Sequence, residues 1–356
     1  VFMDRFELFA LTHPADLEVY PNEGMTEPAK LHRVYGVKNL RIPIRAVEDD
    51  GTDVTDRIER MDRVYPDAFG LKAMRGYAEP HTLTLDLGRL EKPSVLLLTG
   101  WTSYAFSSDN VAAHQAGLSL RPPILEAKNR QGLWRSVADV GIPVGRPQTI
   151  AIDLSEHLQP GEHEVRISTN MRVYWDQVLV GDRAPIDQVA EDVLVPTAAM
   201  LDHRGFSAEL HPDNTAPTIY DYTRVTTVSP WKTMAGQYTR LGDVRRLVTV
   251  QDDQFVIARD GDELALSFDA TELSPVPDGW VRTYFLKADG FSKEMDINSA
   301  SPDSVGPLPF HAMSNYPYGA DEHYPDTPEH RRYRQNYNTR TITRTVPELR
   351  TARDLP

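Results

Sequence analysis

The chain has 356 residues, enough for two or three domains with a buried core. Its net charge of −14 argues against nucleic acid or an anionic membrane as the main partner, and no apolar run is long enough for a membrane span. The lack of cysteine excludes disulfides, thiolate metal sites and cysteine nucleophiles. The first residue is Val1, which indicates a processed chain or a fragment of a larger one.

Residues 1–77 are predicted to be a β-rich segment with one short helix. Strands are expected at 2–10, 17–20 and 40–47, and a helix at 56–65 with Thr55 as its N-cap. The segment either forms a small module of its own or adds strands to the domain that follows. Four acidic residues lie close together here: Asp49, Asp50, Asp53 and Asp56. Their spacing lacks the pattern of an EF-hand calcium loop, so a solvated turn and a helix cap are favoured over calcium.

Residues 78–183 are predicted to form a β-sandwich of the jelly-roll or galactose-binding-like type. Apolar and polar residues alternate in short runs that turn signals separate, the pattern of half-buried strands. The strands are expected at 82–87, 94–99, 124–128, 133–137, 148–154, 164–169 and 173–180, with a hairpin loop at 129–132. No helix of ordinary length is expected between them. Strand parity places six side chains in the core: Leu96, Leu98, Ile150, Ile152, Val165 and Ile167.

Residues 184–298 are predicted to contain a connector, up to about residue 205, and then a second β-rich region. Its clearest signal is a hairpin whose arms, 255–259 and 262–268, flank the turn pair Asp260-Gly261. A further strand is expected at 280–286. Residues 299–356 combine prolines, aromatic residues and arginines, and are predicted to form an extended arm. The arm is expected to dock either on its own chain or on a neighbouring one, through which it would support self-association.

Nine short strings in the chain suggest a family. They are FELFA (6–10), THPADLEVYP (12–21), DLG (86–88), GWTSY (100–104), GIPVG (141–145), YWDQ (174–177), GDV (242–244), ADGFSKEMD (288–296) and PLPFHAM (307–313). Together they resemble the C-terminal region of large bacterial exported proteins with FG-GAP propeller repeats and an ASPIC/UnbV-type segment. The resemblance implies export, a multidomain parent and an adhesive or binding role. It brings no catalytic residue with it.

Two groups of residues are candidates for function. Aromatic faces beside carboxylate and amide groups suit sugars, which predicts a ligand site in the loops after two strands. Its members are Trp101, Tyr104, Asp109, Asn110, Trp175 and Asp176. The alternative is that the tryptophans pack in the core or at its rim and that Asp176 holds a turn.

The second group is a polar cluster with several carboxylates, of which glycoside cleavage needs two. Its members are Asp289, Lys293, Glu294, Asp296, Asn298 and His311. A polar loop with locally paired charges is favoured over catalysis.

The sequence therefore predicts a non-enzymatic binding or assembly module of an exported bacterial protein, in the periplasm, at the cell surface or secreted. It would recognise a glycan or a protein surface. The alternatives are a glycan-active hydrolase using the acidic residues near 289–296, and a purely structural subunit with a docking arm. No cofactor or metal is expected, since no specific motif supports calcium.

Overall fold

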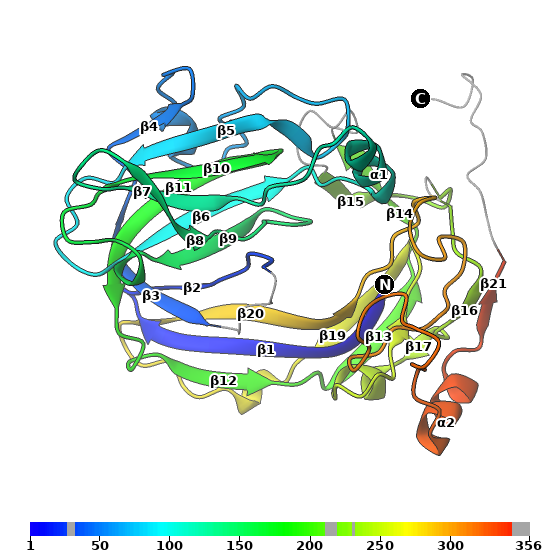
Figure 1. The fold of residues 1–356 in the computed structure, drawn as a ribbon. Helices are drawn as coiled ribbons and strands as arrows, with labels where there is room; N and C mark the ends of the chain where they lie inside the picture. Colours follow the sequence, from blue (N-terminus) through cyan, green and yellow to red (C-terminus); the bar gives the residue numbers. More distant parts are fainter. Residues whose placement is uncertain (27–32, 211–218, 230–231, 344–356) are drawn as a thin grey trace.

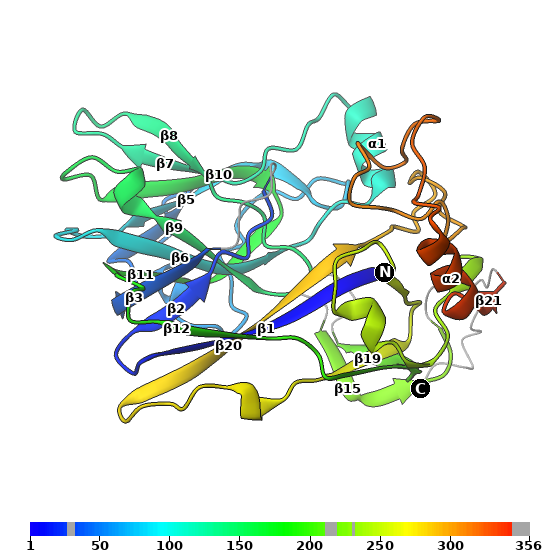
Figure 2. The ribbon, with the colours of Figure 1, turned by 90° about the horizontal axis from the view of Figure 1, so that it is seen from below.

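The computed structural model describes residues 1–26, 33–210, 219–229 and 232–343. The chain is mostly strand and its sheets are antiparallel, which confirms the predicted all-β class. A β-sandwich occupies one side of the molecule. Strands β1 (Phe2–Pro14), β12 (Ala190–Leu194) and β20 (Trp280–Phe291) form a layer beneath it (Figure 1). The view from below shows two elements at opposite ends: the sandwich hairpin of β7 (Ile124–Lys128) and β8 (Trp134–Asp139), and helix α2 (Pro328–Asn336) (Figure 2).

Two five-stranded sheets make up the sandwich. The first has the order β4 (Arg45–Glu48), β5 (Tyr77–Asp86), β10 (Glu164–Met171), β7 (Ile124–Lys128) and β8 (Trp134–Asp139). The second has the order β2 (Glu18–Pro21), β3 (Val34–Arg41), β11 (Val173–Ala184), β6 (Ser94–Thr102) and β9 (Gln148–Asp153).

The core of the sandwich lies between these two sheets. All six residues predicted for it are buried there, at 5% exposure or less: Leu96, Leu98, Ile150, Ile152, Val165 and Ile167. On β10, Val165 and Ile167 face this core while Arg166 and Ser168 remain partly exposed, as the period of a strand requires. Every residue of β6 is buried, because its other face packs in a second cluster with Val37 and Ala151. The central position of β6 explains its unbroken apolar run.

The N-terminal segment contributes strands to two parts of the fold. Strands β2, β3 and β4 belong to the sandwich, the second of the two arrangements that the sequence left open. Strand β1 (Phe2–Pro14) instead pairs along its length with β20 (Trp280–Phe291), and also with β12 (Ala190–Leu194) and β18 (Val256–Ile257). The single strand predicted at 40–47 is divided between β3 and β4.

Two predictions for residues 184–298 were wrong, one about a connector and one about strand pairing. The connector expected up to residue 205 contains β12 and β13 (Ala198–His203). The predicted hairpin around Asp260-Gly261 does not form, because β18 pairs with β1 whereas β19 (Asp262–Ser267) pairs with β13. The turn itself is present, with Asp262 N donating to Arg259 O at 3.1 Å and Gly261 at a φ of +83°.

The remaining strands are short or peripheral. They are β14 (Phe206–Leu210), β15 (Ile219–Thr226), β16 (Gly236–Tyr238), β17 (Gly242–Asp243) and β21 (Arg340–Ile342).

The helices differ from the prediction. Residues 55–58 form one 3-10 turn in place of the helix expected at 56–65. Helix α1 (Ser107–Gln115) interrupts the sandwich region where no helix was expected, and of its residues only Ala113 is fully buried. Helix α2 (Pro328–Asn336) lies within the predicted arm, where Thr327 caps it and Pro328 begins it.

The described part of the arm packs against its own chain. Phe310 and Tyr333 are buried, at 7% and 2% exposure, and the Tyr333 hydroxyl donates to Phe255 O at 2.6 Å. Strand β21 pairs with β16, which adds backbone hydrogen bonds to these apolar contacts. The arm is therefore ordered by docking, as expected, but it also has secondary structure that was not expected. Arg344, Arg350 and Arg353 lie outside the described residues.

Candidate functional site

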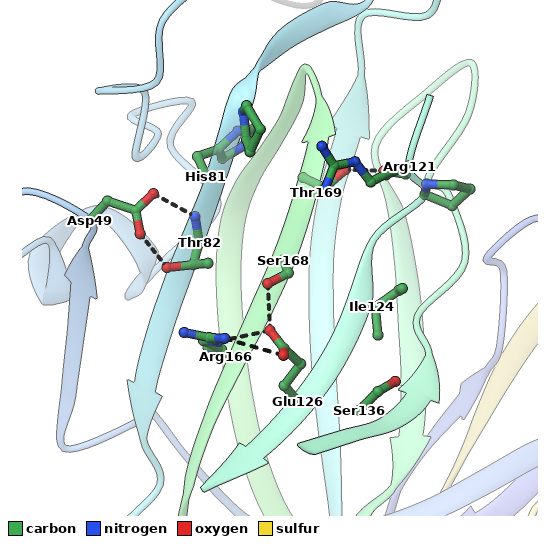
Figure 3. A pocket seen from close by; sticks show the side chains of 12 residues that line it. Asp49, His81, Thr82, Arg121, Ile124, Glu126, Ser136, Arg166, Ser168 and Thr169 are labelled. Atoms are coloured by element: carbon green, nitrogen blue, oxygen red, sulfur yellow. Dashed lines mark hydrogen bonds and ion pairs between the residues drawn. The ribbon is translucent and has the colours of Figure 1, made fainter. Parts of the chain in front are cut away.

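A groove lies on the outward face of the first sandwich sheet, with a volume of about 410 Å³ (Figure 3). We call it the sheet groove. Strands β5, β7, β8 and β10 supply its floor, because the residues that alternate with core positions point outward there. Its lining is Asp49, Pro80, His81, Thr82, Arg121, Pro122, Ile124, Glu126, Ser136, Arg166, Ser168 and Thr169.

A hydrogen-bonded trio occupies the centre of the groove. Arg166 on β10 lies directly opposite Glu126 on β7, and its Nε and Nη2 donate to the two Glu126 oxygens at 2.7 and 3.2 Å. Ser168 Oγ donates to the same carboxylate at 2.5 Å (Figure 3). The hydrogen bonds from Arg166 are the main reason that the pKa of Glu126 lies below its ordinary value. The Arg166 guanidinium also lies over the ring of Trp134, 4.5 Å from its centre, in a cation–π contact.

The upper end of the groove is formed by His81 and Arg121. The His81 ring stacks on Phe69 at 4.3 Å between centroids, and its Nδ1 donates to Glu79 O at 2.8 Å. The proton of the neutral ring is therefore on Nδ1, which leaves Nε2 as a hydrogen-bond acceptor. Burial lowers the pKa of His81, so the neutral form dominates at pH 7. The Arg121 side chain reaches across β10 toward this ring (Figure 3).

The groove is chemically suited to binding and poorly suited to hydrolysis. A glycosidase needs a carboxylic acid with a raised pKa beside a second, free carboxylate. Here Glu126 has a lowered pKa and three hydrogen bonds, while Asp49 accepts from Thr82 N at 2.9 Å and from Thr82 Oγ1 at 2.5 Å. Both carboxylates thus hold the strands and the floor of the groove in place.

The predicted aromatic ligand surface does not form, because both tryptophans are buried. Trp175 is 4% exposed in the sandwich core, and Trp101 is 8% exposed and stacks on Tyr174 at 5.1 Å between centroids. Asp176 is also buried and accepts hydrogen bonds from the backbone of Asp62 and Arg63, the turn-holding role given as its alternative.

The other three members of this predicted site lie around α1. Asp109 accepts from the backbone N–H groups of Phe106 and Arg75, and Asn110 accepts from the Tyr77 hydroxyl at 2.9 Å. They are therefore structural. Tyr104, at 43% exposure, and Asn110 are the exposed members of the six.

The predicted polar cluster is divided into three parts. Glu294 accepts from Ser107 N and Oγ, and Asp296 accepts from Ser108 Oγ, so both carboxylates bind the first turn of α1. Asn298 donates to Ser108 Oγ at 2.9 Å.

The other two parts lie away from this contact. Lys293 Nζ donates to Ser304 O and Gly306 O at 2.6 and 3.0 Å, and burial lowers its pKa to about 8. Asp289 belongs to the third part, with His311. The six residues therefore do not converge on one centre.

The third part is a compact charged centre that we call the His311 centre. His311 Nδ1 lies 2.6 Å from Asp253 Oδ1 and 3.5 Å from Asp4 Oδ2, and Nε2 lies 2.8 Å from Asp289 Oδ1. Burial alone would lower the pKa of His311, but the hydrogen bonds to Asp289 and Asp253 raise it.

One atom each of Asp4, Asp253 and His311 lies within 4.8 Å of the others, a spacing that a metal ion could also bridge. In this arrangement the imidazolium itself supplies the positive charge, so the His311 centre joins the arm to β1 and β20. The four aspartates singled out near residue 50 are distinct from it. Asp50 and Asp53 accept hydrogen bonds from Thr52 and Thr55, which agrees with the turn interpretation.

Comparison with known proteins does not assign the chain to a family. No family model matches the chain. No curated protein matches it either. Within the described residues, no helix has the length and apolar character needed to cross a membrane.

The sheet groove was not among the sites predicted from sequence. Glu126 and Arg166 lie at outward positions of two predicted strands, so alternation alone indicates that each is accessible. That they face each other depends on the pairing of β7 with β10, which local patterns do not specify. A polar face with both signs of charge on adjacent strands was the available signal.

Proposed function

We propose that this chain is a non-enzymatic glycan-binding module of an exported bacterial protein, and that the sheet groove holds the sugar. The observation that supports this most directly is the fixed mixture of donors and acceptors on the groove floor. Arg166 has N–H groups beyond the two that Glu126 accepts, and Glu126 has lone pairs beyond those in use. Sugar hydroxyls both donate and accept, so they match such a surface.

The apolar part of the groove supports the same class of ligand. Pro80, Pro122 and Ile124 lie beside the polar groups and offer surface to the C–H face of a sugar ring. His81 Nε2 adds an acceptor of fixed orientation at one end, because the Phe69 stack and the Glu79 carbonyl hold the ring. Export and bacterial origin rest on the sequence resemblance alone.

The alternatives have less support. A hydrolase near residues 289–296 would need free carboxylates, whereas Glu294 and Asp296 bind α1 and Asp289 binds His311. A purely structural subunit with an arm that binds a neighbouring chain is not favoured either, because the described arm docks on its own chain.

A glycan array probed with the intact chain tests the proposal, together with a variant that fills the groove. Ser136 is exposed on β8 and lines the groove, so Ser136→Tyr should block it without disturbing the core. Ser267 is likewise an exposed strand serine, on β19 outside the groove, and Ser267→Tyr is the matched control. We expect glycan retention by the unmodified chain and the control, and its loss in Ser136→Tyr. Retention that Ser136→Tyr leaves unchanged, or no retention of any glycan, would contradict the proposal.

A further inference from the structure

The charges in the sheet groove are unequally compensated. Two arginines, Arg121 and Arg166, and two carboxylates, Asp49 and Glu126, line it. Arg166 is neutralised by its two-point contact with Glu126, and Asp49 is bound to Thr82. The Arg121 guanidinium has no hydrogen bond or ion pair with any residue that the structure describes. The four charges of the lining sum to zero, but Arg121 is the cation among them whose guanidinium has no direct partner in the described part of the chain.

The position of Arg121 is fixed even though its guanidinium is free. Its backbone N–H donates to Asn170 Oδ1 at 2.7 Å, and its carbonyl accepts from Thr169 Oγ1 at 2.7 Å. Pro122 follows it and restricts the backbone further. The exposed side chain extends over Thr169 into the upper end of the groove, toward His81 (Figure 3). A fixed backbone beneath an uncompensated guanidinium is the arrangement that recognises an anionic group on a ligand.

We propose that Arg121 binds the carboxylate of a uronic acid, so that the sheet groove prefers acidic to neutral glycans. This inference rests on the proposed function and adds the class of sugar. A guanidinium can donate two parallel N–H groups to the two oxygens of a carboxylate, the anion that uronic acids carry. The unprotonated Nε2 of His81 would then accept from a hydroxyl of the same sugar.

Paired ligands isolate the contribution of the carboxylate. Oligosaccharides of pectate and of alginate, each as the free acid and as its methyl ester, are titrated into the intact chain by calorimetry at pH 7.5. The ester retains the sugar and its hydroxyls but removes the charge. We expect at least one free acid to bind about tenfold more tightly than its ester, as a charge-assisted contact implies, and the difference to shrink as salt increases.

Three variants attribute that preference to one residue. Arg121→Gln should remove the difference between acid and ester, and Arg121→Lys should restore part of it, because an ammonium keeps the charge but loses the two-point geometry. Arg89→Gln is the matched control, since the Arg89 side chain is 87% exposed and outside the groove. It should leave both affinities unchanged.

The outcomes separate this inference from the proposed function. Glycan binding that Ser136→Tyr blocks, but with equal affinity for acid and ester or with Arg121→Gln unchanged, would overturn the inference and leave the binding module standing. Binding of sulfated galactan fragments in place of uronates would overturn the carboxylate assignment. If no saccharide of any kind binds, both proposals fall together.

Discussion

Replacing Ile167 of β10 should lower the stability of the fold, whereas replacing its neighbour Arg166 should mainly lower glycan affinity. Ile167 points into the sandwich core at 1% exposure, whereas Arg166 lies on the groove side. Ile167→Ala removes roughly three methyl-sized groups at about 0.8 kcal/mol each, and the cavity left behind adds to this loss. We therefore expect the free energy of unfolding to fall by about 3–4 kcal/mol, within the usual range for such changes.

Replacing Arg166 should instead cost little stability and much glycan affinity. Arg166→Gln breaks the contact with Glu126, but both side chains are partly exposed, at 28% and 18%, so solvent screening keeps the stability loss to about 1 kcal/mol. Glycan affinity should fall at least tenfold in Arg166→Gln, and it should change little in folded Ile167→Ala. Stability is measured by urea unfolding monitored through Trp175, which lies in the same core, and affinity by calorimetry. A loss below 1 kcal/mol in Ile167→Ala, or unchanged affinity in Arg166→Gln, would refute the assignment of the two faces.

Three further predictions concern the rest of the fold. Because the folded-state pKa of His311 is raised, its ion pairs stabilise the protein below pH about 6.5, and this stabilisation is lost as the pH rises through the folded-state pKa. The free energy of unfolding, measured at pH 5.5 and 8.5, should therefore lack this pH dependence in His311→Gln. A pH dependence equal to that of the unmodified chain would contradict the prediction. Burial raises the pKa of Asp4 to about 6, so its ionisation above that pH opposes folding, and Asp4→Asn should raise the melting temperature at pH 8; a lowered one would contradict this. Gly261→Val should cost about 1–3 kcal/mol, because φ is +83° and a Cβ would lie 2.8 Å from His203 Cε1; wild-type melting would show that the turn tolerates a side chain.

The strands of the sandwich could be predicted from sequence because their alternation is local. The prediction that Val165 and Ile167 lie in the core is confirmed, because in a half-buried strand every second side chain is apolar and faces the core. The partners of the strands could not be predicted in the same way. Each of the arms at 255–259 and 262–268 has its own apolar alternation, but each pairs with a different strand, β1 and β13, that lies far away in sequence.

The predicted aromatic ligand site does not form, and the reason lies in strand contacts that local sequence patterns do not specify. Residues 173–176 of β11 are all buried because both faces of the strand are covered there, with Trp175 in the sandwich core and Tyr174 against Trp101. The pairing of β11 with β6 also changes register between Trp175 and Gln177. Gly100 makes room for this, since a Cβ there would lie 2.8 Å from Trp175 Cε3 and 2.4 Å from Tyr174 O. The aromatic rings that suggested a ligand site therefore pack inside the fold, beside a β-bulge in β11.

Helix α2, in contrast, could have been recognised. Thr327 followed by Pro328 and Glu329 is a standard helix start, and it was outweighed by the many prolines of the arm. Helix α1 gave a weaker signal, because its one fully buried residue is Ala113 and it has no apolar stripe.

The pairing of β1 with β20 has a consequence for how the chain is made. Its register joins Phe2 to Phe291 and Pro14 to Trp280, so β1 leaves the ribosome long before its principal partner β20, and most of the other described strands are synthesised between the two. Until then β1 exposes Phe6 and Leu11, which are buried in the finished fold, together with unpaired backbone groups. The sandwich strands from β2 to β11 can meet earlier, since they lie between residues 18 and 184. Ribosome-bound chains stalled before residue 280 should therefore hold a folded sandwich and a protease-sensitive N-terminal strand, and closing so long a loop should make the final step slow.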